Sequence, residues 1–276
     1  MERKLVKQGR NALTVTLPAK WLKEKGLEAG DSINIEERNS ELVIATGRAS
    51  AKTSTELDLI GCERSMIFHS IIARYIQGYD TIIVTHDCPK VMQEAAHRFI
   101  GMVIEEQTAT RTVLRSVIAV PEDNFDAVLR RAAHIFVQQA RTLEEMTRGA
   151  ADFARLKDDE HLLDDHLMYC LRYLNKYENR KHAYRYFLIC ATIELAADQV
   201  SRIGKHIGRD QKLAAIIAKG VDEYVKALFS NDFRRLYSSL RSFRNQIGTR
   251  TFAQGLAFTL AEILYNYLGY ISEGNT

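Results

Sequence analysis

Two pairs of acidic residues stand four positions apart in the sequence, Glu160 with Asp164 and Glu194 with Asp198. In a helix, residues at this spacing project from the same face. The second pair lies in a segment, 187–197, that is apolar nearly all round, where a carboxylate is costly unless a cation or a hydrogen-bond donor meets it. Oxygen donors on adjacent antiparallel helices suit a hard or borderline divalent ion. The spacing therefore predicts a metal site built from these four residues.

The same residues also allow a structural interpretation. Arg202 follows Asp198 by four positions and would neutralise its charge. The acidic stretch 158–160 would cap the N-terminus of a helix. From the residues alone, metal binding and ion pairing with capping both stay open.

A second candidate site is a basic cluster at the start of the sequence. Residues 1–25 hold seven Lys and Arg against two Glu, whereas residues 26–46 hold five acidic residues against one Arg. Guanidinium and ammonium groups neutralise phosphates and release counterions, which gives a salt-sensitive affinity for DNA. The candidate DNA-binding residues are Arg3, Lys4, Lys7, Arg10, Lys20 and Lys23. The alternative is a solvated surface on a dimerisation domain that binds a partner protein.

A short β-rich segment must carry this cluster. Residues 4–17 alternate between apolar and polar types and predict two strands joined by a turn. Pro18 opens a brief helix that Gly26 ends, and two further strands are predicted at 32–37 and 41–45. So short a segment buries little apolar surface by itself, so a second copy is expected to complete its sheet.

The order of these elements resembles the AbrB/SpoVT-type swapped-hairpin DNA-binding domain. The residues that carry the resemblance are Arg3-Lys4-Leu5, Gly9-Arg10, Leu17-Pro18, Trp21-Leu22, Gly26-Leu27, Gly30-Asp31 and Leu42-Val43-Ile44. The resemblance implies that two chains interleave their hairpins into one barrel and present basic residues to double-stranded DNA. It therefore agrees with the homodimer that the size of the segment already requires.

Two further regions follow the β-rich segment. Residues 47–55 have the small, polar composition of a linker, and residues 56–120 read as a small α/β element that begins with a helical run to Tyr75. After Pro121 the apolar period becomes 3.6 residues, which predicts an antiparallel helical bundle over 121–276. Its first apolar stripe consists of Phe125, Val128, Leu129, Ala132, Phe136, Ala140, Leu143 and Met146. With residues 1–46 as the first domain, the expected fold class is α+β, mainly α.

The predicted bundle resembles the PhoU family. The signature is the helix 186–203, in which Glu194 and Asp198 follow an apolar run, and an earlier acidic stretch at 158–165 stands where PhoU-type units carry a second carboxylate motif. The resemblance implies that Glu160, Asp164, Glu194 and Asp198 hold iron or another divalent cation. It also implies a role in regulating phosphate uptake, and the two resemblances together match the arrangement of archaeal phosphate-uptake regulators. In a second bundle unit, Asn266 replaces the signature aspartate, which weakens any second metal site.

Several classes of protein are disfavoured by the composition. No stretch reaches the roughly 18 apolar residues of a membrane span. The four Cys are far apart and fit a reducing, cytoplasmic setting rather than a disulfide framework. No Gly-rich phosphate loop or nucleophile elbow is present, and His86-Asp87 lacks the supporting histidines of a phosphohydrolase, so the protein is not expected to be an enzyme.

Two functional hypotheses follow. In the first, the protein is a cytoplasmic, dimeric, DNA-binding transcriptional regulator of phosphate uptake, and the PhoU-like bundle senses or relays phosphate status. In the second, it is a protein-interaction regulator whose bundle docks on a phosphate transporter or signalling kinase, while the N-terminal barrel only dimerises.

Overall fold

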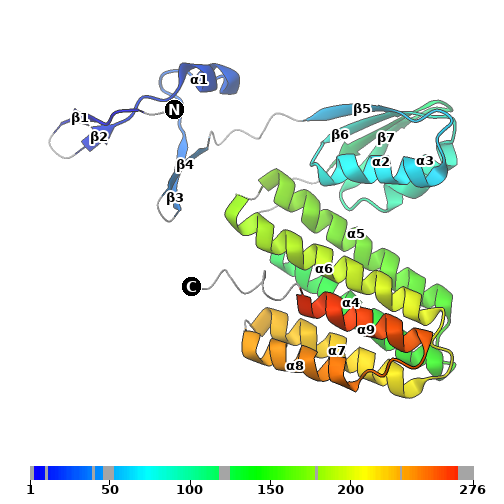
Figure 1. Cartoon of the computed structure of the whole chain (residues 1–276). Helices are drawn as coiled ribbons and strands as arrows, with labels where there is room; N and C mark the ends of the chain where they lie inside the picture. Colours follow the sequence, from blue (N-terminus) through cyan, green and yellow to red (C-terminus); the bar gives the residue numbers. More distant parts are fainter. Residues whose placement is uncertain are drawn as a thin grey trace. The chain divides into compact units, whose positions relative to one another are not determined.

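A computed structural model describes residues 3–9, 12–38, 41–45, 53–117, 125–177, 180–230 and 232–266. The chain divides into two compact units, Met1–Ala51 and Lys52–Thr276 (Figure 1). The described part is mainly helical with small sheets, none of which closes into a barrel, and this confirms the expected α+β, mainly α class.

The Met1–Ala51 unit contains two separate antiparallel hairpins. Strand β1 (Val6–Gln8) pairs with β2 (Ala12–Thr14), and β3 (Asn34–Arg38) pairs with β4 (Glu41–Ala45). Helix α1 (Ala19–Lys25) lies between them in the sequence. It starts directly after Pro18 and ends at Gly26, whose φ of 62° lies in the left-handed region that glycine adopts without strain.

The second unit begins with a four-stranded mixed sheet in the order β5-β6-β8-β7. Its elements are β5 (Ser54–Asp58), α2 (Arg64–Ile76), β6 (Thr81–Thr85), α3 (Pro89–His97), β7 (Met102–Gln107) and β8 (Arg111–Ser116). Strands β5 and β6 are parallel and α2 connects them, whereas β8 pairs antiparallel with both β6 and β7. Met168 of the bundle joins the apolar core of this sheet and its helices, so the sheet region and the bundle pack as one unit.

The remaining described residues form the helical bundle. Its elements are α4 (Phe125–Thr147), α5 (Phe153–Tyr177), α6 (Arg180–Gly204), α7 (Gln211–Ser230), α8 (Phe233–Gln246) and α9 (Phe252–Asn266). Helices α4, α5 and α6 contact one another, α8 lies against α7 and α9, and the two groups meet where α4 touches α7 and α6 touches α9 (Figure 1). No helix in the described ranges has both the length and the apolar character of a membrane span.

The predicted stripe of α4 is confirmed. Phe125, Leu129, Ala132, Phe136, Ala140 and Leu143 are buried in the bundle core, and Val128 and Met146 pack against it. Residues 118–120 of the expected α/β element and residues 267–276 of the expected bundle lie outside the described residues.

Two expected elements differ from the structure. Ser54 and Thr55, assigned to a linker, belong with 56–58 to strand β5, where a helical run was expected. The segment holds one strongly apolar residue, Leu57, so it lacks the alternation of apolar and polar residues that predicts a strand. Parallel hydrogen bonding to β6 holds it in the strand conformation. Helix α5 begins at Phe153, not near Asp159, because the Asp152 carboxylate accepts a hydrogen bond from the Arg155 amide at 2.9 Å and caps the helix there.

Candidate functional site

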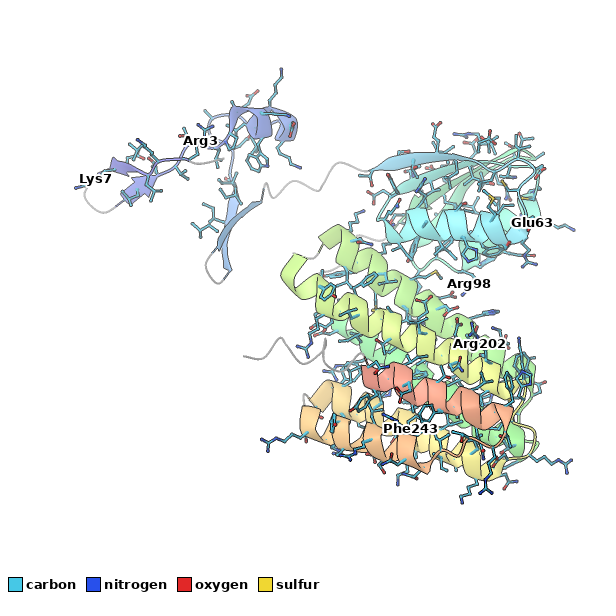
Figure 2. The ribbon with its side chains drawn as sticks, in the orientation of Figure 1. Arg3, Lys7, Glu63, Arg98, Arg202 and Phe243 are labelled. Atoms are coloured by element: carbon cyan, nitrogen blue, oxygen red, sulfur yellow. The ribbon has the colours of Figure 1, made fainter. Side chains whose placement is uncertain are left out.

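The predicted DNA-binding residues lie at the surface of the Met1–Ala51 unit. Arg3 and Lys4 precede β1, Lys7 is in β1, and all three side chains are exposed (Figure 2). Lys20 and Lys23 are exposed on α1, where Lys20 also approaches Glu24 at 3.9 Å. Arg10 lies outside the described residues. The described members of the set are thus free to meet a polyanion.

The hairpins of this unit leave apolar side chains uncovered. Leu5 is 65% exposed and Leu42 is 69% exposed, although both belong to strand-forming segments. The other large apolar side chains exposed on this unit are Val6, Leu13, Val15 and Ile35. Among the residues of the unit whose side chains the structure describes, none is buried. One chain therefore lacks a core here, as the sequence predicts for a segment that closes its sheet with a second copy.

The four predicted metal ligands lie on two neighbouring helices of the bundle. Glu160 and Asp164 are on α5, and Glu194 and Asp198 are on α6, which packs against α5. Glu160 is buried, Asp164 and Asp198 are half-buried, and Glu194 is exposed. The sequence spacing therefore places the four carboxylates in one region, as predicted.

Basic and hydroxyl groups already contact two of these carboxylates. The Lys157 ammonium and the Ser201 hydroxyl both donate to Glu160. Arg98, which follows α3, donates from Nε to Asp165 at 2.8 Å and from Nη2 to Asp164 at 3.4 Å and to the His161 carbonyl at 3.3 Å (Figure 2). The sheet region thus supplies a cation to the acidic face of α5.

Burial and the charges of neighbouring carboxylates raise the pKa of Asp164, Glu194 and Asp198. Burial raises the pKa of Asp164 to about 7; Arg98 opposes this rise, and the charges of Glu160, Glu194 and Asp198 add to it. Desolvation and the neighbouring Asp198 raise the pKa of Glu194. Desolvation and Glu160 raise the pKa of Asp198, against the attraction of Arg202 and Lys157.

The arrangement does not fit a bound metal ion as it stands. Lys157, Ser201 and Arg98 make the contacts that a cation would otherwise make with Glu160 and Asp164. Across the described ranges, no group of three or more His, Cys, Asp and Glu side chains is arranged to hold an ion. The capping alternative is wrong, because residues 158–160 lie inside α5 and its N-terminus is capped by Asp152.

The sequence interpretation missed the contacts that join the sheet region to the bundle. Besides Arg98, they comprise Asp80, which receives the Lys176 ammonium and lies 3.9 Å from an Arg172 nitrogen, and Asn175, whose amide donates to the Ile76 carbonyl at 2.9 Å. Each pair joins residues more than 60 positions apart. No local pattern signals such pairs, so only the tertiary packing of α2 on α5, together with the reach of Arg98 from the end of α3, reveals them.

One comparison with known proteins bears on the N-terminal unit. Residues 6–52 match a family described as "antidote-toxin recognition MazE, bacterial antitoxin". The match supports the AbrB-type resemblance of this segment and is compatible with DNA binding and dimerisation. It does not extend to the bundle, where the PhoU resemblance and the phosphate role stay predictions. No curated protein and no solved structure matches the chain significantly.

The raised pKa of Asp164 predicts a pH-dependent stability. Between the usual value of 3.8 and about 7, the folded protein holds a proton at Asp164 that the unfolded chain has lost. Stability is therefore expected to rise as the pH falls through this interval. Urea unfolding of the full chain across the interval measures the slope, which Asp164→Asn should flatten and Asp126→Asn, at the exposed start of α4, should leave unchanged. Equal slopes in all three proteins would contradict the assignment.

Proposed function

We propose that this protein is a homodimeric, DNA-binding transcriptional regulator whose N-terminal unit contacts the phosphate backbone through Arg3, Lys4, Lys7, Arg10, Lys20 and Lys23. The observation that carries the proposal is the match of residues 6–52 to the MazE family. Lys7, Lys20 and Lys23 are exposed within that segment, and Arg3 and Lys4 are exposed directly before it. The uncovered apolar hairpins add support, because a second copy would bury them and double the cationic surface.

The finer proposal concerns the bundle. Its resemblance to PhoU proteins suggests that it senses or relays phosphate status and so regulates phosphate uptake. The contacts of Arg98 with Asp164 and Asp165 support such a relay from the bundle to the sheet region. A change in the charge of the acidic residues on α5 and α6 would act directly on Arg98, which belongs to the sheet region. Sequencing the genomic fragments that co-purify with the protein at high and low phosphate tests this part.

Charge reversal in the N-terminal unit tests DNA binding. In the full chain, Arg3→Glu with Lys7→Glu should weaken retention of a random-sequence duplex pool by roughly tenfold for each lost phosphate contact at about 50 mM salt. The oligomeric state, measured by light scattering, should not change, because both side chains are exposed. Lys90→Glu with Arg131→Glu, two exposed positions on α3 and α4, is the matched control.

The outcomes separate the two functional hypotheses. Loss of duplex retention in the N-terminal variant alone supports a DNA-binding regulator. Retention equal to that of the unmodified protein would contradict it and favour the protein-interaction regulator, in which the N-terminal unit only dimerises.

A further inference from the structure

Positive charge is concentrated in one part of the second unit. Residues 201–250 hold eleven Lys and Arg against four Asp and Glu, whereas the rest of residues 52–276 holds eighteen basic against twenty-four acidic residues. Most of residues 201–250 form helices α7 and α8, which pack against each other. The positive field of the second unit is therefore centred on this helix pair.

Each of the four acidic residues of this region accepts a hydrogen bond or forms an ion pair. Asp210 and Asp232 accept hydrogen bonds from the Leu213 and Arg235 amides, both at 3.0 Å, at the starts of α7 and α8. Asp222 pairs with Lys226 and lies 3.6 Å from Arg141, and Glu223 accepts a hydrogen bond from the Ser239 hydroxyl at 2.9 Å. Because residues 201–250 hold only four acidic residues against eleven basic ones, the region keeps an excess of positive charge.

Six cations remain exposed on this surface. They are Lys212, Lys219, Arg234, Arg235, Arg241 and Arg250. Within the described part of the chain, none of the six makes an ion pair with an acidic side chain. By contrast, Arg244 on the opposite side of α8 pairs with Glu262 of α9 at 2.9 Å. The α7–α8 cationic face, as we call these six residues, thus differs from the paired surface beside it.

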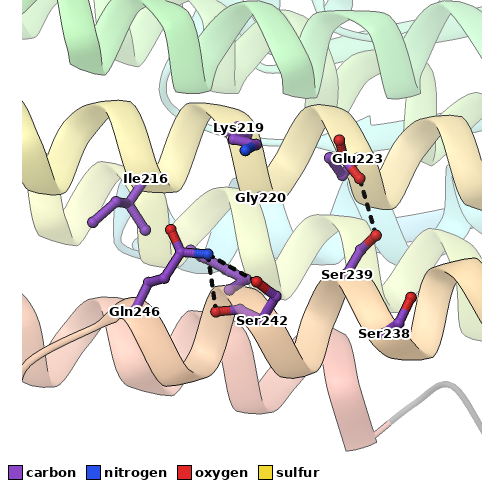
Figure 3. A pocket seen from close by; sticks show the side chains of 9 residues that line it. Ile216, Lys219, Gly220, Glu223, Ser238, Ser239, Ser242 and Gln246 are labelled. Carbon is purple, nitrogen blue, oxygen red and sulfur yellow. Dashed lines mark hydrogen bonds between the residues drawn. The ribbon is translucent and has the colours of Figure 1, made fainter.

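A polar groove of about 240 Å³ runs between the two helices. At its floor the buried ring of Phe243 packs directly against Gly220 of α7, which has no side chain to hold the two helices further apart. Lys219 and Glu223 of α7 stand at the groove, and α8 lines it with three serine hydroxyls and the amide of Gln246 (Figure 3). The Ser239 hydroxyl donates to the Glu223 carboxylate, and the Gln246 amide donates to the Ser242 hydroxyl at 2.9 Å. Lysine, arginine, serine and glutamine side chains are the usual partners of DNA phosphates.

We propose that the α7–α8 cationic face is a second contact surface for the sugar-phosphate backbone of duplex DNA. The inference rests on the proposed function, because the N-terminal unit of the same chain would bring DNA to this face at a high effective concentration. The excess of exposed basic side chains over acidic ones in this region selects a polyanion as the occupant of the face. The contact carries affinity without sequence information, since its donors meet phosphates rather than base edges.

Lys219→Glu with Arg235→Glu in the full chain tests the proposal. Both side chains are exposed. Arg235 lies in the first turn of α8, where the helix dipole favours a negative charge, so Arg235→Glu is compatible with the helix. At about 50 mM salt, affinity for the random-sequence duplex pool should fall by roughly a hundredfold, and the slope of log affinity against log salt should decrease by about 2. The neutral pair Lys219→Gln with Arg235→Gln should show a smaller loss in the same direction, and Lys90→Glu with Arg131→Glu should show none.

The outcomes distinguish this inference from the proposed function. If Arg3→Glu with Lys7→Glu abolishes retention while the α7–α8 variants keep both affinity and salt slope, the inference is overturned and the regulator stands. If the α7–α8 variants alone lose affinity, the inference is supported and the N-terminal interface fails. If the α7–α8 variants bound phosphatidylserine vesicles less well but kept their affinity for DNA, the face would be a membrane contact and the inference would be overturned. Unchanged thermal unfolding shows that the variants fold.

Discussion

Asp80→Ala is expected to destabilise the protein by about 1–3 kcal/mol, because it removes a charged hydrogen-bond partner from a half-buried ion pair. Asp80 meets the Lys176 ammonium and lies near Arg172, both on α5, and Arg172 is only 4% exposed. The Arg172 guanidinium also donates to the Tyr75 carbonyl at 2.8 Å and lies 4.9 Å from the centre of the Tyr75 ring. Removing the carboxylate takes away the negative charge that both cations share, at the contact that holds the sheet region on the bundle.

Urea unfolding of the full chain measures this loss. The matched control is Glu105→Ala, which breaks the pair with Arg115 on the sheet surface, where both side chains are about two-fifths exposed, at 43% and 42%. Such an exposed pair contributes less than about 1 kcal/mol. A loss in Asp80→Ala no larger than in Glu105→Ala would show that the buried contact is not structural. Burial tends to raise the pKa of Asp80, but hydrogen bonds from Lys176 and the Thr53 amide lower it, so the Asp80 carboxylate is ionised at neutral pH.

Gly220→Leu is expected to cost about 3 kcal/mol through overpacking. A Cβ atom at Gly220 would stand 2.6 Å from the ring of Phe243, which is 2% exposed and has little room to move. In a helix, leucine replaces glycine with a gain of up to about 1 kcal/mol in propensity, so the steric term must exceed that gain. Thermal or urea unfolding of the full chain gives the difference.

A glycine in an open position supplies the control. Gly255 lies in α9, and a Cβ atom there would meet nothing within 4 Å. Gly255→Leu is therefore expected to leave stability unchanged or raise it by up to about 1 kcal/mol. Combining Gly220→Leu with Phe243→Ala should recover part of the loss, because the smaller side chain makes room for the leucine. Equal effects at the two glycines would contradict the close contact between α7 and α8.

The elements predicted from the sequence are those whose signals lie in residues close together along the chain. The α4 stripe follows from a 3.6-residue apolar period, and α1 follows from a proline at its start and a glycine at its end. Strand β5 was missed because its residues are mostly polar and its strand conformation depends on pairing with β6. The start of α5 was misplaced because Asp152 was not recognised as its cap.

The candidate site was predictable in position but not in its partners. Glu160 and Asp164 lie on α5, Glu194 and Asp198 lie on α6, and these two helices contact each other. The groups that meet these carboxylates could not be derived in the same way. Arg98 reaches α5 from a distant part of the chain, so its role depends on tertiary packing rather than on sequence spacing.

If a second copy covers the hairpins of the N-terminal unit, as we propose, the stability of that unit is subject to mass action. When a segment gains its core only from a twin, the folded fraction depends on the total protein concentration. At low copy number the unit would spend more time unfolded and open to proteases, and the occupied fraction of a DNA target would rise with the square of the chain concentration. A modest change in expression would then produce a disproportionate change in the output of the regulated gene.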